Sequence, residues 1–272
     1  MKDQALQIVR EVEKDINKLN YLRDYLQHVI LREMFEQDWL QELVYHGGTA
    51  LSMVYDFPRF SEDLDFHLLK PDLDYTLESK IDVLVKALQK NGYFINLNPK
   101  YEGNVKGVFI KFKQILYEAG ISRHKNKNLN IKLEIDVNPP LGFRTETRTI
   151  DKFFPFVIQH HDISSFLAGK MHAILQRGWT KGRDFFDLNY FVNHWPNITP
   201  NFIYLNNALK QTGYKGKEVN EKNWRQLAVN RIEETDWKAV KQDVDSFILR
   251  KGDLKAFRKD ILVKNLSQKE KQ

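Results

Sequence analysis

The hydrophobic pattern of this chain changes its period near residue 160, and that change constrains the fold most. Before it, runs that alternate apolar and polar residues, as β-strands do, occur among helical segments. After it, apolar residues recur at helical spacing almost to the end of the chain. We therefore predict two domains: an α+β region over residues 1–160 and a mainly α-helical region over residues 161–272.

Individual elements can be placed from the same pattern. Residues 3–40 and 75–91 show helical spacing, and Gly92 is typical of a helix C-terminus. Strands are expected in the runs ELVYH, RFSEDLDFHLL, YFINLN, VKGVFIKFKQILY, LNIKLEIDVN and FFPFVIQ. In the later region, Asp162 is expected to cap the helix ISSFLAGKMHAILQRG. Further helices are expected in GRDFFDLNYFVNHW, in NFIYLNNALKQTG, over residues 220–249 and at the end of the chain.

Composition narrows the class of protein. The chain has no cysteine, which excludes disulfides and thiolate metal sites, and it has no apolar run near the roughly 20 residues that span a bilayer. We expect a cytoplasmic protein without a membrane partner. The net charge is +6, with basic clusters at residues 122–132 and 250–272. Such clusters favour polyanions such as RNA, and a solvated lysine-rich surface is the alternative.

Two acids stand out in the run RFSEDLDFHLL. Asp63 and Asp65 fall on one face of the predicted strand, together with Ser61 and His67. Their Cα atoms would be about 6.5–7 Å apart, so both carboxylates can reach one hard divalent cation or a close pair of cations. Without a cation, repulsion and desolvation would raise one pKa or weaken the strand. A pair of solvated acids at a sheet edge is the alternative.

Two further features bear on this site. Gly47 and Gly48 form a turn that opens a helix capped by Thr49, and N–H groups at a helix start bind phosphate. Asp136 lies on the polar face of LNIKLEIDVN, so a third carboxylate could complete a two-metal site for phosphoryl transfer. A simple turn and a strand-end acid remain the alternatives. The histidines are not at metal-ligand spacing, and none is assigned a role.

Taken in order, these motifs resemble the signature of the polymerase-β-like nucleotidyltransferase superfamily. The chain is most similar to the AbiEii/AbiGii-type nucleotidyltransferase toxins. The resemblance runs from residue 46 to about residue 190 and rests on a glycine turn followed by R-x-S-x-D-x-D, on a lysine in GKMHAILQR, and on R-D-x-x-D-L. The residues that carry these motifs are Gly47, Gly48, Arg59, Ser61, Asp63, Asp65, Lys170, Arg183, Asp184, Asp187 and Leu188.

The resemblance implies a mixed β-sheet core with flanking helices, and a helical region that completes the nucleotide site. It implies transfer of a nucleoside monophosphate from an NTP. It also implies a pair of Mg²⁺ ions held by Asp63, Asp65 and Asp136. Asp136 would also take the acceptor's proton, and Lys170 would stabilise the triphosphate as pyrophosphate leaves. The residues expected to bind the nucleotide are Gly47, Gly48, Thr49, Arg59, Ser61, Lys170, Arg177 and Asp184.

Some assignments stay open at this point. Relatives often carry Gly-Ser where this chain has Gly47-Gly48, so either Thr49 or Ser61 is expected to supply the phosphate-binding hydroxyl. On the helix after Asp162, Lys170 and Arg177 point the same way and could clamp a triphosphate. A surface Lys–Arg pair is the alternative. Asp184 is expected to pair with one of them, to orient the nucleotide, or to be a first-turn acid that favours the helix dipole.

The resemblance also implies a biological role. It implies a toxin of a toxin–antitoxin or abortive-infection system in phage defence, with an antitoxin partner and with RNA, tRNA foremost, as acceptor. One alternative keeps the fold but transfers the nucleotide to an antibiotic-like small molecule or a protein side chain. A second is a non-catalytic module that binds nucleotide or RNA. The basic composition disfavours a pocket for a cationic drug, and carboxylates near phosphates disfavour binding without a metal.

Overall fold

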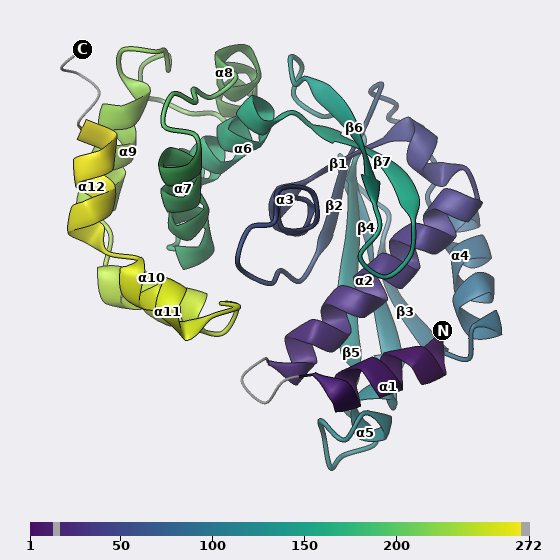
Figure 1. Ribbon diagram of the computed structural model, residues 1–272. Coiled ribbons are helices and arrows are strands. Elements are labelled where there is room, and N and C mark those ends of the chain that lie inside the picture. Colours follow the sequence, from purple (N-terminus) through teal and green to yellow (C-terminus); the bar gives the residue numbers. More distant parts are fainter. Residues whose placement is uncertain (13–16, 268–272) are drawn as a thin grey trace. The chain divides into compact units, whose positions relative to one another are not determined.

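The computed structural model describes residues 1–12 and 17–267 and divides into two compact units (Figure 1). Unit 1 comprises Met1–Asp56, Phe60–Pro139 and Thr145–His160, and unit 2 comprises Phe57–Arg59, Pro140–Arg144 and His161–Gln272. Two short segments from the first 160 residues therefore belong with unit 2. That residues 1–160 and 161–272 are separate domains stays a prediction.

Unit 1 is organised around a seven-stranded mixed sheet. Its order is β3-β4-β5-β2-β1-β7-β6, with β5 parallel to β2, β7 parallel to β1, and antiparallel pairing of β3 with β4, β4 with β5 and β2 with β1. The strands are β1 (Leu43–His46), β2 (Leu64–Leu68), β3 (Phe94–Lys100), β4 (Val105–Lys113), β5 (Leu129–Asp136), β6 (Thr145–Ile150) and β7 (Phe156–His161). The mixed sheet and its flanking helices confirm the α+β class.

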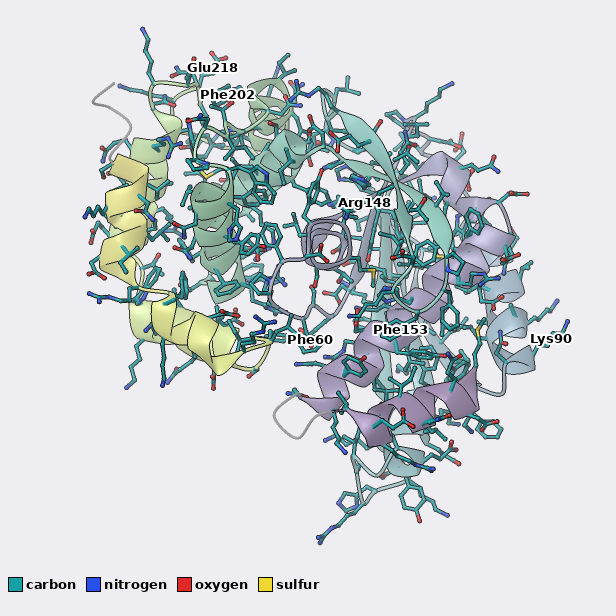
Figure 2. The ribbon with its side chains drawn as sticks, viewed as in Figure 1. Phe60, Lys90, Arg148, Phe153, Phe202 and Glu218 are labelled. Atoms are coloured by element: carbon teal, nitrogen blue, oxygen red, sulfur yellow. The ribbon has the colours of Figure 1, made fainter. Side chains whose placement is uncertain are left out.

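Helices cover one face of the sheet in unit 1. Helix α2 packs on β5 and α4 packs on β3 (Figure 1), where the apolar side chains of β4 and β5 are buried. Burying each aliphatic side chain there stabilises the folded state by about 1.5–3 kcal/mol relative to leaving it exposed. Phe153 packs edge-on against Tyr25 and His28 of α2 (Figure 2). The helical elements are α1 (Lys2–Glu11), α2 (Lys18–Glu36), a 3₁₀ turn η1 (Trp39–Glu42), α3 (Gly47–Tyr55), α4 (Glu78–Lys90) and α5 (Ile115–Glu118).

Unit 2 is helical, as the periodicity after residue 160 predicts. Asp162 caps α6 by accepting a hydrogen bond from the Ser165 N–H at 2.7 Å. Leu167, Met171 and Ile174, which recur at helical spacing, form its buried stripe. The helices are α6 (Ile163–Gln176), α7 (Gly182–His194), α8 (Phe202–Gln211), α9 (Trp224–Glu233), α10 (Trp237–Asp245), α11 (Lys251–Ala256) and α12 (Lys259–Ser267).

Several local predictions differ from the structure. Strand β2 begins at Leu64, so Ser61 and Asp63 precede it rather than alternating along it. The end of VKGVFIKFKQILY turns into α5 after Gln114, which has φ +61°. Residues 220–249 form two helices, because Asp236 starts a new helix by capping Lys238 N–H. The predicted helical position Ile16 lies outside the described residues. No helix among the described residues has the length and apolar character needed to cross a bilayer.

Candidate active site

The predicted acids of unit 1 lie where β2 meets its two neighbouring strands. In the register of the sheet, Asp65 is paired with His46 of β1 on one side and with Glu134 of β5 on the other. The next row pairs His67 with Asp136. Because alternate strand residues share a face, all five side chains lie on the face opposite to the one that α2 and α4 cover. The structure thus brings Asp65 and Asp136 to one face of adjoining strands.

Gly47 fits tightly beside Asp65. It has φ +78°, a conformation that favours glycine, and a Cβ built on it would lie 3.1 Å from Cγ of Asp65 and overlap one of its carboxylate oxygens. Gly47 is the first residue of α3 and Gly48 the second. The start of a nine-residue helix, where N–H groups lack partners within the helix, therefore lies directly beside the Asp65 carboxylate.

Thr49 does not cap α3 as predicted, because the helix already begins at Gly47. Its hydroxyl instead donates a hydrogen bond to the backbone carbonyl of Asp63, and the residue is buried. Thr49 therefore fixes the segment that carries Asp63. Ser61 is half-buried, and its backbone carbonyl accepts a hydrogen bond from Nε2 of Gln27 at 3.3 Å. Whether either hydroxyl binds phosphate stays a prediction.

The surroundings of Asp136 favour a protonated carboxyl relative to an exposed aspartate. Burial raises the pKa of Asp136, and a hydrogen bond accepted from the Asn138 N–H at 2.9 Å opposes the rise. Its row partner His67 is buried, with its ring 3.9 Å from that of His46. Glu134, beside Asp65, forms an ion pair with Lys132 at 2.8 Å. The sequence alone indicates no role for these two histidines or for Glu134, because only the strand register brings them next to the acids.

Carboxylates of Asp63, Asp65 and Asp136 have the chemistry that Mg²⁺ prefers, because hard cations take oxygen ligands. Within the described part of the chain, however, no three His, Asp or Glu side chains are placed to hold one metal ion. For Asp63, Asp65 and Asp136, the strand register bears on this result. Asp136 lies opposite His67, one row beyond Asp65, and not opposite Asp65 itself. Mg²⁺ and its stoichiometry therefore stay predictions.

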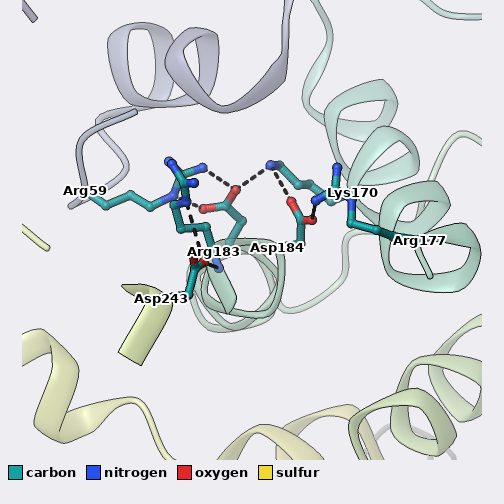
Figure 3. A network of polar contacts seen from close by, with 7 residues as sticks. Arg59, Lys170, Arg177, Arg183, Asp184 and Asp243 are labelled. Atoms are coloured by element: carbon teal, nitrogen blue, oxygen red, sulfur yellow. Dashed lines mark hydrogen bonds and ion pairs between the residues drawn. The ribbon is translucent and has the colours of Figure 1, made fainter. Parts of the chain in front are cut away.

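Unit 2 contains a buried network of charged side chains (Figure 3). Arg59 forms two hydrogen bonds with Asp187, each 2.5 Å long. Lys170 Nζ lies 2.7 Å from Asp187 and 3.0 Å from Asp184, and Arg177 Nη1 lies 2.5 Å from Asp184. Lys170 and Arg177 thus point the same way, as the helical spacing predicts, and Asp184 pairs with both of them.

The charges of this network stabilise one another. Burial would raise the pKa of Asp187, but Arg59 and Lys170 outweigh it and hold that pKa below its usual value. Burial likewise would lower the pKa of Arg59, and Asp187 reverses this so that the pKa is raised. The side chains of Arg59 and Asp187 are 1% and 0% exposed. Arg59 and Asp187 therefore both remain charged although both are buried.

The motif R-x-S-x-D-x-D is divided between the two units. Arg59 belongs to unit 2, where it forms a β-bridge with Ile248, whereas Ser61, Asp63 and Asp65 belong to unit 1. Its pairing with Asp187 gives Arg59 a structural role that the sequence did not indicate. Asp187 itself was noted only as part of a motif, and nothing in a single sequence links it to a residue 128 positions away.

The start of α7 is held by close packing. Gly182 lies against α10 so tightly that a Cβ would come within 2.9 Å of the Val240 Cα and overlap its carbonyl oxygen. The next residue, Arg183, donates its backbone N–H to Asp243 at 3.1 Å and stacks its guanidinium 3.7 Å from the Phe247 ring centroid. These contacts fix the turn of helix on which Asp184 and Asp187 lie.

A mixed β-sheet that carries a glycine turn and neighbouring acids, joined to a helical unit, is the arrangement that the resemblance to nucleotidyltransferases implies. The comparison with protein families specifies it further. Residues 29–259 match the family described as the AbiEii nucleotidyl transferase toxin of type IV toxin–antitoxin systems. The match covers most of the chain, so the protein belongs to this family. The resemblance inferred from its motifs is therefore confirmed, as is its class as a nucleotidyltransferase.

Two solved structures are similar to the chain at low identity. A nucleotidyltransferase from Helicobacter pylori is 18% identical and has a TM-score of 0.46, with 89% of this chain and 95% of the other covered. JHP933, also from Helicobacter pylori, is 17% identical and has a TM-score of 0.48, with 94% and 96% covered. No curated protein matches the chain in sequence.

Proposed function

We propose that this chain transfers a nucleoside monophosphate from an NTP to RNA, with tRNA as the leading acceptor, in a Mg²⁺-dependent reaction. The observation that carries the proposal is the contact of Gly47 with the Asp65 carboxylate. A helix start attracts phosphate, and a carboxylate attracts the cation that accompanies phosphate. The membership in a nucleotidyltransferase toxin family supports this reading.

The reaction follows from the chemistry of the residues. The acceptor hydroxyl oxygen attacks the α-phosphorus, the bond from that phosphorus to the bridging oxygen breaks, and pyrophosphate leaves. The hydroxyl proton passes to Asp136 or to water. Mg²⁺ held by Asp63 and Asp65 would neutralise the charge that develops on the phosphates.

The phosphate contacts can be assigned more narrowly than from sequence. The Thr49 hydroxyl already donates to the Asp63 carbonyl, which favours Ser61 as the phosphate-binding hydroxyl beside the N–H groups of Gly47 and Gly48. Lys170 supplies positive charge to the triphosphate in this proposal, together with Arg177. Both cations have carboxylate partners, so the phosphates compete with Asp184 for them.

The proposed setting is that of the family: a toxin of the bacterial cytoplasm that acts in phage defence and is held in check by an antitoxin. Its family comprises toxins of type IV toxin–antitoxin systems, which supports an antitoxin partner and a nucleotide substrate. The RNA acceptor is supported by the net charge of +6.

The test is transfer of label from each radiolabelled NTP to total tRNA in the presence of Mg²⁺. Wild-type protein is expected to label tRNA, and the Asp63→Ala and Asp65→Asn variants are expected to lose the activity. Asp82→Ala is the matched control, because this acid is exposed on α4, away from the candidate residues. Transfer that persists in Asp63→Ala, or no transfer from any NTP, would contradict the proposal. Labelling of a protein or a small molecule instead would support the alternative acceptors.

A further inference from the structure

One half of the sheet in unit 1 has a face that none of the helices packed on the sheet covers, among the residues that the structure describes. Strands β3, β4 and β5 bury one set of alternate side chains beneath α2 and α4, and the other set faces solvent. Among the solvent-facing residues, Phe94, Val105 and Phe109 are exposed hydrophobics. We call this surface the open face, and its residues are Phe94, Asn96, Asn98, Lys100, Val105, Phe109, Lys111, Lys113, Asn130 and Lys132, with the buried Gly107 on the same face of β4.

The open face is basic. Lys111 and Lys113 of β4 and Lys132 of β5 lie on it, with Lys100 at its β3 edge. The connection from β4 to β5 adds further exposed cations at the far end of the strands, where Figure 1 shows α5. The cations of that connection are Arg123, Lys125 and Lys127. A surface of this charge is complementary to a polyanion.

An exposed aromatic ring lies among the lysines of the open face. Phe109 is 37% exposed, and the Nζ of Lys132 lies 5.5 Å from its ring centroid. In the strand register Phe109 is opposite Asn98 on one side and Lys132 on the other. An exposed aromatic side chain on a sheet, flanked by cations and amides, is the combination with which sheets bind single-stranded RNA: the ring stacks on a base, the cations hold phosphates and the amides reach base edges.

The open face is continuous with the candidate acids. Phe109 is opposite Lys132, and two residues further along, Gly107 is opposite Glu134, the neighbour of Asp65. A Cβ at Gly107 would lie 3.2 Å from Cγ of Glu134, so only glycine leaves room for that side chain to lie across β4. From Asn130 to Asp136 the strand rises about 20 Å. A strand of RNA lying along β5 would therefore end at the acids.

We propose that the open face of β3, β4 and β5 binds a single-stranded segment of the acceptor RNA, with a base stacked on Phe109 and phosphates on Lys111, Lys113 and Lys132. This inference rests on the proposed transfer to RNA and adds the surface that holds the acceptor. The segment runs from the β4–β5 connection toward Asp65 and Asp136, so that its terminal hydroxyl reaches the acids. The face recognises the RNA by its charge and by stacking, and stacking alone tolerates every base.

Two variants of the full chain and two matched controls test this. Phe109→Ala removes the ring, and Lys111→Glu/Lys113→Glu reverses two charges on the open face. Phe35→Ala is the aromatic control, since Phe35 is also 37% exposed but lies on α2. Lys86→Glu/Lys90→Glu is the charge control, because both lysines are exposed on α4 (Figure 2 labels Lys90) and the net charge changes equally. Retained thermal midpoints show that each variant is folded.

The first readout is the fluorescence anisotropy of a short, labelled, unstructured RNA titrated at several salt concentrations. Phe109→Ala is expected to weaken binding about fivefold or more. The double lysine variant is expected to weaken it further and to reduce the salt dependence by about one to two phosphate contacts. The two controls are expected to bind as wild type does. Equal losses in the α4 control, or equal competition by poly-glutamate with no effect of Phe109→Ala, would overturn the inference in favour of a general acidic ligand.

The second readout separates this inference from the proposed function. In the tRNA labelling assay, the open-face variants are expected to raise KM for tRNA about fivefold or more, with kcat nearly unchanged. Transfer to tRNA with a wild-type KM in both variants would overturn the open face as the acceptor surface and leave the proposed function intact. A wild-type protein that labels no RNA would overturn both.

Discussion

Nε and Nη2 of Arg59 each lie 2.5 Å from a carboxylate oxygen of Asp187, and both side chains are buried. The same carboxylate lies 2.7 Å from Lys170 Nζ. Arg59 thereby fixes Asp187, and Asp187 in turn fixes the lysine that the family motif marks. A two-pronged contact of this kind suits arginine, because a planar guanidinium matches both carboxylate oxygens and an ammonium group does not.

We expect Arg59→Ala to lower the free energy of unfolding by about 3–5 kcal/mol, because it leaves a buried carboxylate with one partner fewer. Arg59→Lys keeps the charge but loses one of the two bonds, so its cost should fall between alanine and wild type. Urea unfolding followed by circular dichroism measures both. Arg258→Ala is the control, since Arg258 forms a similar but exposed pair with Asp260 and should leave the midpoint unchanged. An equal loss in Arg59→Ala and Arg258→Ala would contradict the prediction.

The acid dependence of stability should depend on Asp187. Because its folded-state pKa lies below its unfolded value, its contribution is fully present above about pH 4 and disappears as the pH falls through the folded pKa. Asp187→Asn removes this titration and costs about 3–5 kcal/mol near neutrality. We expect the gap in unfolding free energy between wild type and this variant to narrow below about pH 4. A gap of constant size from neutrality to the acid limit would refute this.

Gly47 should tolerate no side chain. Alanine there must adopt a left-handed conformation and must also displace the Asp65 carboxylate, so Gly47→Ala is expected to cost about 1–3 kcal/mol and to abolish nucleotide transfer. Gly120→Ala is the matched control, because Gly120 has φ +67° but no atom within 4 Å of its Cβ position. Gly120→Ala should lose only the stability that a left-handed backbone costs alanine, and it should keep full activity. Equal activity of the two variants would show that contact with Asp65 is unimportant.

Two glycines of unit 2 should respond to alanine with opposite signs. Gly182→Ala forces a methyl group into the Val240 carbonyl and is expected to destabilise by about 1–3 kcal/mol. Gly169 lies in the middle of α6 with open space around its Cβ position. Gly169→Ala is therefore expected to stabilise the folded protein by about 0.5–1 kcal/mol. Thermal unfolding of both variants provides the measurement. A destabilised Gly169→Ala variant would show that α6 is packed more tightly than this geometry indicates.

Features set by local physics could be predicted from the sequence. The cap at Asp162 and the buried stripe of Leu167, Met171 and Ile174 follow from helical spacing alone. The pairing of Arg59 with Asp187 could not be predicted, because no periodicity joins residues so far apart in the chain. Strand β6 was missed for another reason: its run TETRTI is mostly exposed and lacks the apolar alternation that marks a strand.

The site in unit 1 shows the same limit. The acids were found from their spacing, but their neighbours depend on the strand register, which a one-residue slip would change completely. The register places Glu134, which sequence reasoning passed over, directly beside Asp65, and it places Asp136 one row further along. The identity of a metal ligand therefore requires the pairing of strands as well as the alternation within each.

This register makes Mg²⁺ binding a sharp test of the proposed site. A ligand that binds only the folded state stabilises it by about 2.7 kcal/mol at a concentration 100 times its Kd. We therefore expect Mg²⁺ to raise the thermal midpoint of the wild type and to leave that of Asp65→Asn unchanged. Glu134→Gln should keep part of the effect, since Glu134 already has Lys132 as a partner. Asp82→Asn, on the exposed face of α4, should respond as the wild type does. If Mg²⁺ stabilises Asp65→Asn as strongly as the wild type, the cation is held elsewhere, and the contact between Gly47 and Asp65 must serve a purpose other than placing a metal beside phosphate.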